Sequence, residues 1–171
     1  MITPAYALSM ARYNAWQNRQ MAAAMDMLDE AALRQDRGAF CGGIMATANH
    51  ILWADRMWMA RLQGQPPPEG GIEASTAITP TRAVWSAERF RMDGRILLWA
   101  EGLKALDLTG DLTWHSAVAG RQVTKPKAEL IVHMFNHQTH HRGQIHAMLT
   151  AAGASAPVSD LFFMPQEGPW L

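Results

Sequence analysis

Apolar side chains recur at helical spacing in the first third of the chain. This pattern predicts a first helix from about Pro4 to Leu33 and a second from about Gly42 to Leu62. Thr3 and Pro4 supply an N-cap and a first-turn proline for the first helix. A Gly-Gln-Pro-Pro-Pro run ends the second helix, because proline lacks the backbone donor that a helix needs.

The segment 66–79 is rich in Pro, Gly, Ser and Thr and has little apolar periodicity. We expect a loop here, longer than the usual connection between adjacent helices, which indicates a crossover to a non-adjacent position. A third helix then begins at the capping sequence Thr79-Pro80-Thr81 and continues to about Leu106. The residues assigned to its apolar side are Val84, Trp85, Ala87, Phe90, Ile96, Leu97 and Trp99.

Leu108 to Thr124 has a different pattern, which favours a short β-hairpin over a helix. The fourth helix is expected from near Pro126 to Gly153, a residue suited to the left-handed position after a helix. The tail, residues 154–171, should form an irregular strap with one turn near Asp160-Leu161. The sequence therefore predicts one all-α domain over residues 1–171, a four-helix bundle with a short β-hairpin before the fourth helix.

Composition and charge narrow the function classes. Fifteen basic residues balance fifteen acidic ones, which argues against a nucleic-acid partner and against polybasic membrane anchoring. No stretch approaches the roughly 18 apolar residues of a membrane span, and the N-terminus lacks the pattern of a signal peptide. We therefore expect a cytoplasmic protein without a membrane partner. The one cysteine, Cys41, has no internal disulfide partner and is expected to be a small apolar side chain.

Four histidines fall within nine positions of the fourth predicted helix. On a helical wheel with His133 at zero, His137 lies at about 40° and His141 at about 80°, in the middle of the apolar stripe. His140 and His146 fall well off the stripe and should face solvent or a neighbour. His133 lies at the edge, where it would be either a hydrogen-bond partner of a ligand or a residue of the helix margin.

Two imidazoles four residues apart on one helical face can converge on one metal ion. Burying them without a partner would be costly, and a metal would satisfy one nitrogen of each. A third ligand is expected from His50, which shares a helical face with apolar residues of the second helix. His115, in the expected hairpin, is the lower-ranked alternative. Three histidines leave coordination positions open, as in catalytic sites.

Three parts of the chain resemble the DinB/YfiT-like family of helical bundles. The segment His133–Gln144 resembles that family's fourth-helix motif, and residues 13–19 and 49–58 resemble the patterns of its first and second helices. The closing sequence from Leu149 to Gly153, followed by Asp160-Leu161, is also similar. The resemblance therefore covers most of the chain.

The resemblance implies a bundle in up-down-down-up order with the long crossover between the second and third helices. It implies a divalent metal, commonly zinc or nickel, bound by one histidine of the second helix and by two histidines of the fourth helix. These positions match His50, His137 and His141. Homodimers are common in the family. Its characterised members include thiol transferases and thiol-dependent isomerases that use low-molecular-weight thiols such as bacillithiol or mycothiol.

Together these features predict a metal-dependent thiol transferase that joins a low-molecular-weight thiol to a small electrophilic substrate. A metal-dependent hydrolase is the second hypothesis, although the ligand helices show no obvious carboxylate base. A non-catalytic metal-binding stress-response protein is the third. Three imidazoles suit zinc, nickel, copper and iron alike, so the residues alone leave the metal open.

Overall fold

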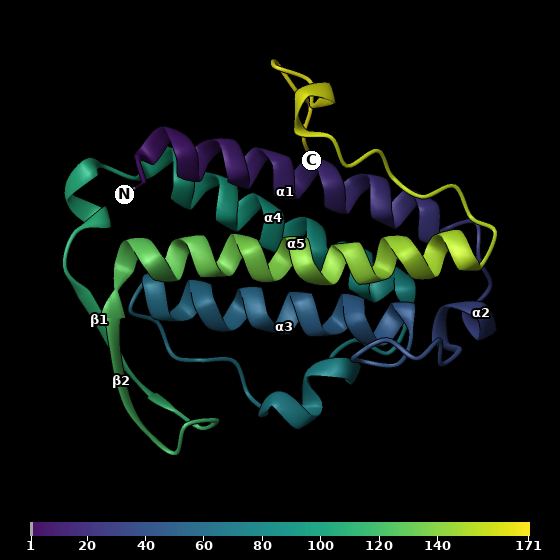
Figure 1. Cartoon of the computed structure of the whole chain (residues 1–171), viewed down its shortest axis with the longest axis horizontal. Coiled ribbons are helices and arrows are strands. Elements are labelled where there is room, and N and C mark those ends of the chain that lie inside the picture. The colour runs from purple at the N-terminus through teal and green to yellow at the C-terminus, as the bar shows by residue number, and fades with distance from the viewer. Residues whose placement is uncertain (1) are drawn as a thin grey trace.

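The computed structural model describes residues 2–171, and most of them lie in helices (Figure 1). None of the helices in these residues is both long and apolar enough to cross a lipid bilayer. The long helices are α1 (Pro4–Met25), α3 (Ile44–Leu62), α4 (Arg82–Gly102) and α5 (Lys127–Ala151). The shorter elements are α2 (Glu30–Arg34), the 3₁₀ turns η1 (Ile72–Ala77), η2 (Ala105–Leu108) and η3 (Leu161–Phe163), and the strands β1 (Asp111–Ser116) and β2 (Arg121–Pro126).

The four long helices pack around one core, with α1 and α3 each lying against both α4 and α5. An ion pair between Arg82 and Asp26 joins the start of α4 to the end of α1, so these two helices are antiparallel. The Trp85 indole donates to the Ala48 carbonyl near the start of α3, and α3 and α4 run parallel (Figure 1). A parallel pair needs a connection as long as the helices, which explains the long crossover between α3 and α4.

The local signals for helix ends were correct in most places. Thr3 and Thr81 accept hydrogen bonds from the backbone three residues ahead, and Gly153 has the left-handed conformation, with φ of 77°. The predicted extension of the first helix to Leu33 is wrong. The helix ends at Met25, and Asp29 then caps the separate helix α2 by accepting from the Ala32 amide at 2.7 Å.

The crossover contains more structure than the sequence pattern suggested. Residues 72–77 form the 3₁₀ turn η1, which packs against α3 and buries Ser75. Thr79 anchors the end of this segment, because its amide and its hydroxyl both donate to the Asn49 side-chain oxygen, at 3.1 and 2.7 Å. The crossover is thereby held beside the N-terminal half of α3.

The hairpin prediction is confirmed, since β1 and β2 form an antiparallel pair with Trp114 opposite Val123. Trp114 contacts Trp58 of α3 edge-on, with ring centroids 5.7 Å apart, and this contact fixes the hairpin against the bundle. The tail is the irregular strap that was expected, with its one turn at Leu161–Phe163. Its carbonyl at Ser159 accepts from the Tyr13 hydroxyl of α1 at 2.6 Å.

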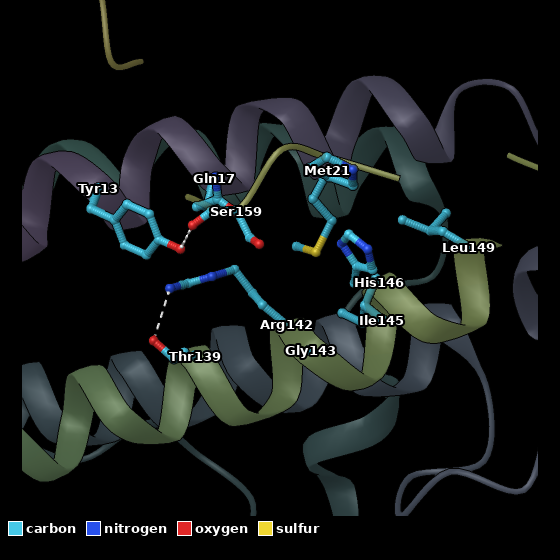
Figure 2. A pocket seen from close by; sticks show the side chains of 11 residues that line it. Tyr13, Gln17, Met21, Thr139, Arg142, Gly143, Ile145, His146, Leu149 and Ser159 are labelled. Carbon is cyan, nitrogen blue, oxygen red and sulfur yellow. Dashed lines mark hydrogen bonds between the residues drawn. The ribbon is translucent and has the colours of Figure 1, made fainter. Parts of the chain in front are cut away.

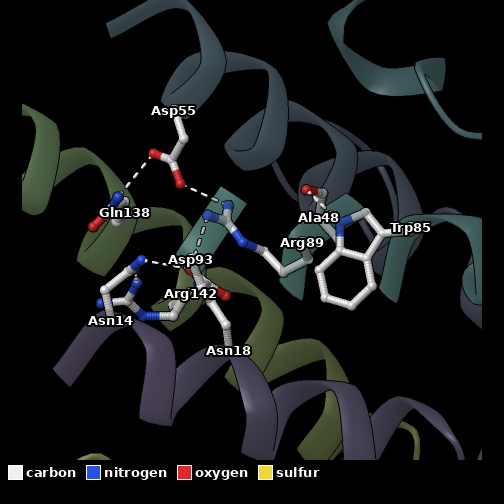
Figure 3. Close-up of polar contacts among 9 residues, drawn as sticks. All are labelled: Asn14, Asn18, Ala48, Asp55, Trp85, Arg89, Asp93, Gln138 and Arg142. Carbon is white, nitrogen blue, oxygen red and sulfur yellow. Dashed lines mark hydrogen bonds and ion pairs between the residues drawn. The ribbon is translucent and has the colours of Figure 1, made fainter. Parts of the chain in front are cut away.

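A buried polar network joins all four long helices (Figure 3). Arg89 of α4 lies between two carboxylates, at 2.6 Å from Asp55 of α3 and 2.8 Å from Asp93 of its own helix. Gln138 of α5 donates to Asp55 at 2.8 Å. The α1 residue Asn14 donates to Asp93 at 2.9 Å, so the network sets the register of all four helices.

The network overturns part of the assignment for the third helix. Phe90 and Val84 were placed on its apolar side, yet they are 60% and 42% exposed, and Ala87 is exposed as well. The buried face includes Arg89 and Asp93 instead. Two opposite charges four residues apart usually indicate a solvent-exposed helix face. Here the cation and the anion also bind polar groups on neighbouring helices, so both can be buried.

Candidate metal centre

Three histidines from two helices meet at the interface of α3 and α5. His50 comes from α3 and His137 and His141 from α5, and one ring nitrogen of each lies within 4.8 Å of the others. Their ring centroids are 4.4 to 5.2 Å apart. The structure therefore brings together the three residues that the sequence selected, because α3 and α5 are antiparallel neighbours and each carries its histidines on the facing side.

Two of the imidazoles are oriented by hydrogen bonds at their Nδ1 atoms. His50 Nδ1 lies 2.9 Å from the Ser75 hydroxyl, which itself donates to the Ile72 carbonyl at 2.6 Å. Ser75 must therefore accept from His50 Nδ1–H. His141 Nδ1 donates in the same way to the Gln144 side-chain oxygen at 2.7 Å. Both rings are thus held as tautomers whose Nε2 carries the free lone pair.

The environment keeps the three imidazoles neutral. Burial, followed by the charge of His141, lowers the pKa of His50 to about 4. Burial and then the neighbouring histidines lower the pKa of His137 to about 3, and burial also lowers the pKa of His141. Neutral imidazoles repel each other little and offer lone pairs, so this is the protonation state that a metal ion requires.

Aromatic side chains surround the cluster. Trp53 stacks on the His50 ring at a centroid distance of 6.1 Å, and Phe40 contacts His50 and His141 at 6.4 and 6.1 Å. Phe40 is 77% exposed, so it stands at the solvent side of the cluster. It lies in the tight turn between α2 and α3, which depends on Gly42 at φ of 84°.

The other histidines lie outside the cluster. His115 is exposed on β1, and His140 is exposed on α5, where it contacts the Gln144 amide. His146 is half-buried on a different side of α5. His133 packs edge-on against Trp58. This position agrees with the expectation that His133 lies at the edge of the apolar stripe of the helix.

Sequence reasoning missed Ser75 and Phe40. Ser75 orients His50, but it belongs to a crossover without apolar periodicity, and its role depends on how that segment folds back onto α3. Phe40 stands between two glycines in a turn, where a large apolar residue is unusual. That placement was the one signal in the sequence for a side chain kept exposed beside a site.

The side chain of Gln144 contacts His141 and His140 of its own helix. It therefore acts by orienting an imidazole. Burial raises the pKa of the Cys41 thiol, in agreement with its expected role as an apolar side chain.

The donor set fits a divalent metal ion. Three neutral imidazoles, with one nitrogen of each within 4.8 Å of the others, match the ligands of three-histidine centres. The Nδ1 hydrogen bonds on two of them match the support that such ligands need. Three protein ligands leave at least one position for another molecule. No carboxylate belongs to the cluster in residues 2–171.

Two known proteins are similar to this chain in sequence or in fold. Protein DinB of Bacillus subtilis (strain 168) is 27% identical over 157 residues, covering 89% of this chain and 90% of that protein. The crystal structure of a DinB-like protein from Bacillus cereus ATCC 10987 is similar in fold, with a TM-score of 0.60, 20% identity, and coverage of 84% of this chain and 90% of that one. The profile of the DinB family matches residues 1–169, and the chain belongs to that family.

Proposed function

We propose that this protein binds one divalent metal ion, zinc or nickel, at His50, His137 and His141, and uses it to transfer a low-molecular-weight thiol to a small electrophilic substrate. The observation that carries the proposal is the convergence of three neutral imidazoles, two of them held by Nδ1 hydrogen bonds that leave the Nε2 lone pair free. A cation held by three neutral ligands keeps its full positive charge and stabilises the thiolate form of a thiol.

The chain's own residues would prepare the reactants. Ser75 and Gln144 hold the two imidazole rings in place, so little reorganisation is needed when the metal and the thiol arrive. Phe40 and Trp53 offer apolar ring faces beside the site, where they can hold an apolar substrate and exclude water. In the transfer, the thiol sulfur forms a bond to the electrophilic carbon. The thiol proton passes to solvent, and the leaving group departs with the electrons of the broken bond.

Hydrolysis has less support from the geometry. A metal-dependent hydrolase usually needs a carboxylate or another base to take a proton from water. Asp55 is a carboxylate five residues after His50 on α3, but it is buried against Arg89 and Gln138. It is committed to the bundle network and is not free to act at the cluster.

A spectroscopic titration tests the thiol-transferase proposal. The protein is loaded with Co²⁺, and its visible spectrum is followed while a panel of small thiols is added. The proposal predicts new sulfur-to-metal charge-transfer bands with at least one thiol, and their loss in His137→Ala. Metal bound in one equivalent without a spectral response to any thiol would contradict the transferase and favour a non-catalytic metal-binding protein.

A further inference from the structure

A cavity lies on a different side of α5 from the histidine cluster. It has a volume of about 410 Å³ and is bounded by α1, α5 and the tail (Figure 2). A helix turns about 100° per residue, so Arg142 points toward α1 while its neighbour His141 points toward α3. The cavity is therefore separate from the histidine cluster. Its size lies within the range of small-molecule sites, roughly 300–1,000 Å³.

Arg142 gives the cavity a buried positive charge. Its side chain is only 8% exposed and lies between α5 and α1 (Figure 2). The guanidinium donates to the Asn14 side-chain oxygen and, at 3.4 Å, to the Thr139 hydroxyl. It forms no ion pair with a carboxylate in the part of the chain that the structure describes, residues 2–171.

A buried cation without an anionic partner is costly to maintain. A guanidinium carries its charge at neutral pH, so this charge stays inside the protein. The buried carboxylates Asp55 and Asp93 both pair directly with Arg89 and not with Arg142. An anion that entered the cavity would therefore find a guanidinium with donors still free to bind it.

The rest of the cavity wall suits an apolar body. Met21 of α1, Ile145 and Leu149 of α5 and Pro157 of the tail line it away from the guanidinium. The tail forms part of the wall and is held to α1 by two hydrogen bonds of 2.6 Å. The Tyr13 hydroxyl donates to the Ser159 carbonyl, and the Gln17 side-chain amide donates to the Val158 carbonyl. The shape of the cavity is thus set before any ligand arrives, which favours binding.

We propose that this cavity is a second binding site, for a small carboxylic acid with an apolar body, whose carboxylate pairs with Arg142. The cavity supplies one fixed charge and an apolar wall, and these match the two ends of such a molecule. The proposal does not depend on the metal chemistry at the histidine cluster.

Calorimetric titration of the chelator-treated protein tests the site, with octanoate as the probe and octanamide as its uncharged counterpart. Octanoate should bind about tenfold or more tightly than octanamide, since a charged hydrogen bond is stronger than a neutral one by that order. Arg142→Gln should remove this preference. Equal binding of the two probes, or no binding of octanoate by the wild type at about 10 mM, would overturn the proposal.

Gly143 provides a variant that does not depend on Arg142. It lines the cavity from α5, and a Cβ built there meets no atom within 4 Å. Gly143→Leu should fill the cavity and weaken octanoate binding at least tenfold, while the better helix former keeps the protein folded. The matched control is Gly102→Leu, at the end of α4, where a Cβ also meets nothing and no cavity residue lies.

Three variants, Gly143→Leu, Gly102→Leu and His137→Ala, distinguish binding in the cavity from binding at other sites. Octanoate should bind Gly102→Leu and His137→Ala as it binds the wild type. If Gly143→Leu binds octanoate as tightly as Gly102→Leu does, or if His137→Ala loses the binding, the ligand lies elsewhere and the assignment to this cavity is wrong.

Discussion

Replacing Asp93 with asparagine should change how the stability of the protein depends on pH. Asp93 is buried, and its loss of hydration raises its pKa from 3.8 to about 6, even though Arg89 and Asn18 favour the charged form. Arg89 is shared with Asp55, so one cation serves two carboxylates. The native protein therefore holds a proton on Asp93 at pH values where the unfolded chain releases it.

The sign and size follow from this difference. A raised pKa in the folded state means that the stabilising contribution is complete below about pH 4 and is lost as pH rises through about 6. The shift of about two pH units corresponds to roughly 3 kcal/mol, at 1.36 kcal/mol per unit. The free energy of unfolding of the wild type, minus that of Asp93→Asn, should fall by about this amount between pH 4 and pH 7.

Urea denaturation of both proteins at several pH values measures this difference, and groups that titrate alike in both cancel. Asp111→Asn is the control, since this carboxylate is exposed at the start of β1, and its difference from the wild type should stay constant. A difference for Asp93→Asn that is also constant to within about 1 kcal/mol, or that grows with pH, would refute the account of the buried network.

Two further variants test single contacts. Ser75→Ala removes the hydrogen-bond acceptor of His50 Nδ1, so it should weaken the metal affinity about 10- to 100-fold. Competition with a chromophoric chelator measures this affinity. The control Ser86→Ala, on α4, should leave the affinity unchanged. Unchanged affinity in Ser75→Ala would show that His50 needs no such support. Asp29→Ala removes the cap of α2 and should cost about 1 kcal/mol in thermal or urea unfolding, which a loss near zero would contradict.

Local patterns were enough to predict the four long helices and the hairpin. Caps such as Thr3 and Thr81 act within three residues, and apolar periodicity depends on the helix itself. The histidine cluster could be predicted from the sequence for the same reason. His137 and His141 lie on the core-facing stripe of one helix and His50 on that of another, so packing these stripes together brings the rings into contact.

The structural features that could not be predicted from the sequence depend on contacts between residues far apart in the chain. Arg89 and Asp93 look like a solvated pair until Asp55 and Asn14 are placed beside them by the packing of α3 and α1. Ser75 gains its role only when the crossover folds back onto α3. Such contacts arise from tertiary structure, and no local periodicity encodes them.

Metal binding by the three imidazoles can be measured directly. Chelator-treated protein is titrated with Zn²⁺ and Ni²⁺, and the bound metal and its ligands are determined by elemental analysis and X-ray absorption. We expect one equivalent of bound metal, with three imidazole nitrogens at about 2.0–2.1 Å when the metal is zinc. His137→Ala should lose the bound metal. His140→Ala should keep it, because the exposed ring of His140 lies outside the cluster. Less than about a tenth of an equivalent in the wild type, or equal binding by both variants, would contradict this expectation.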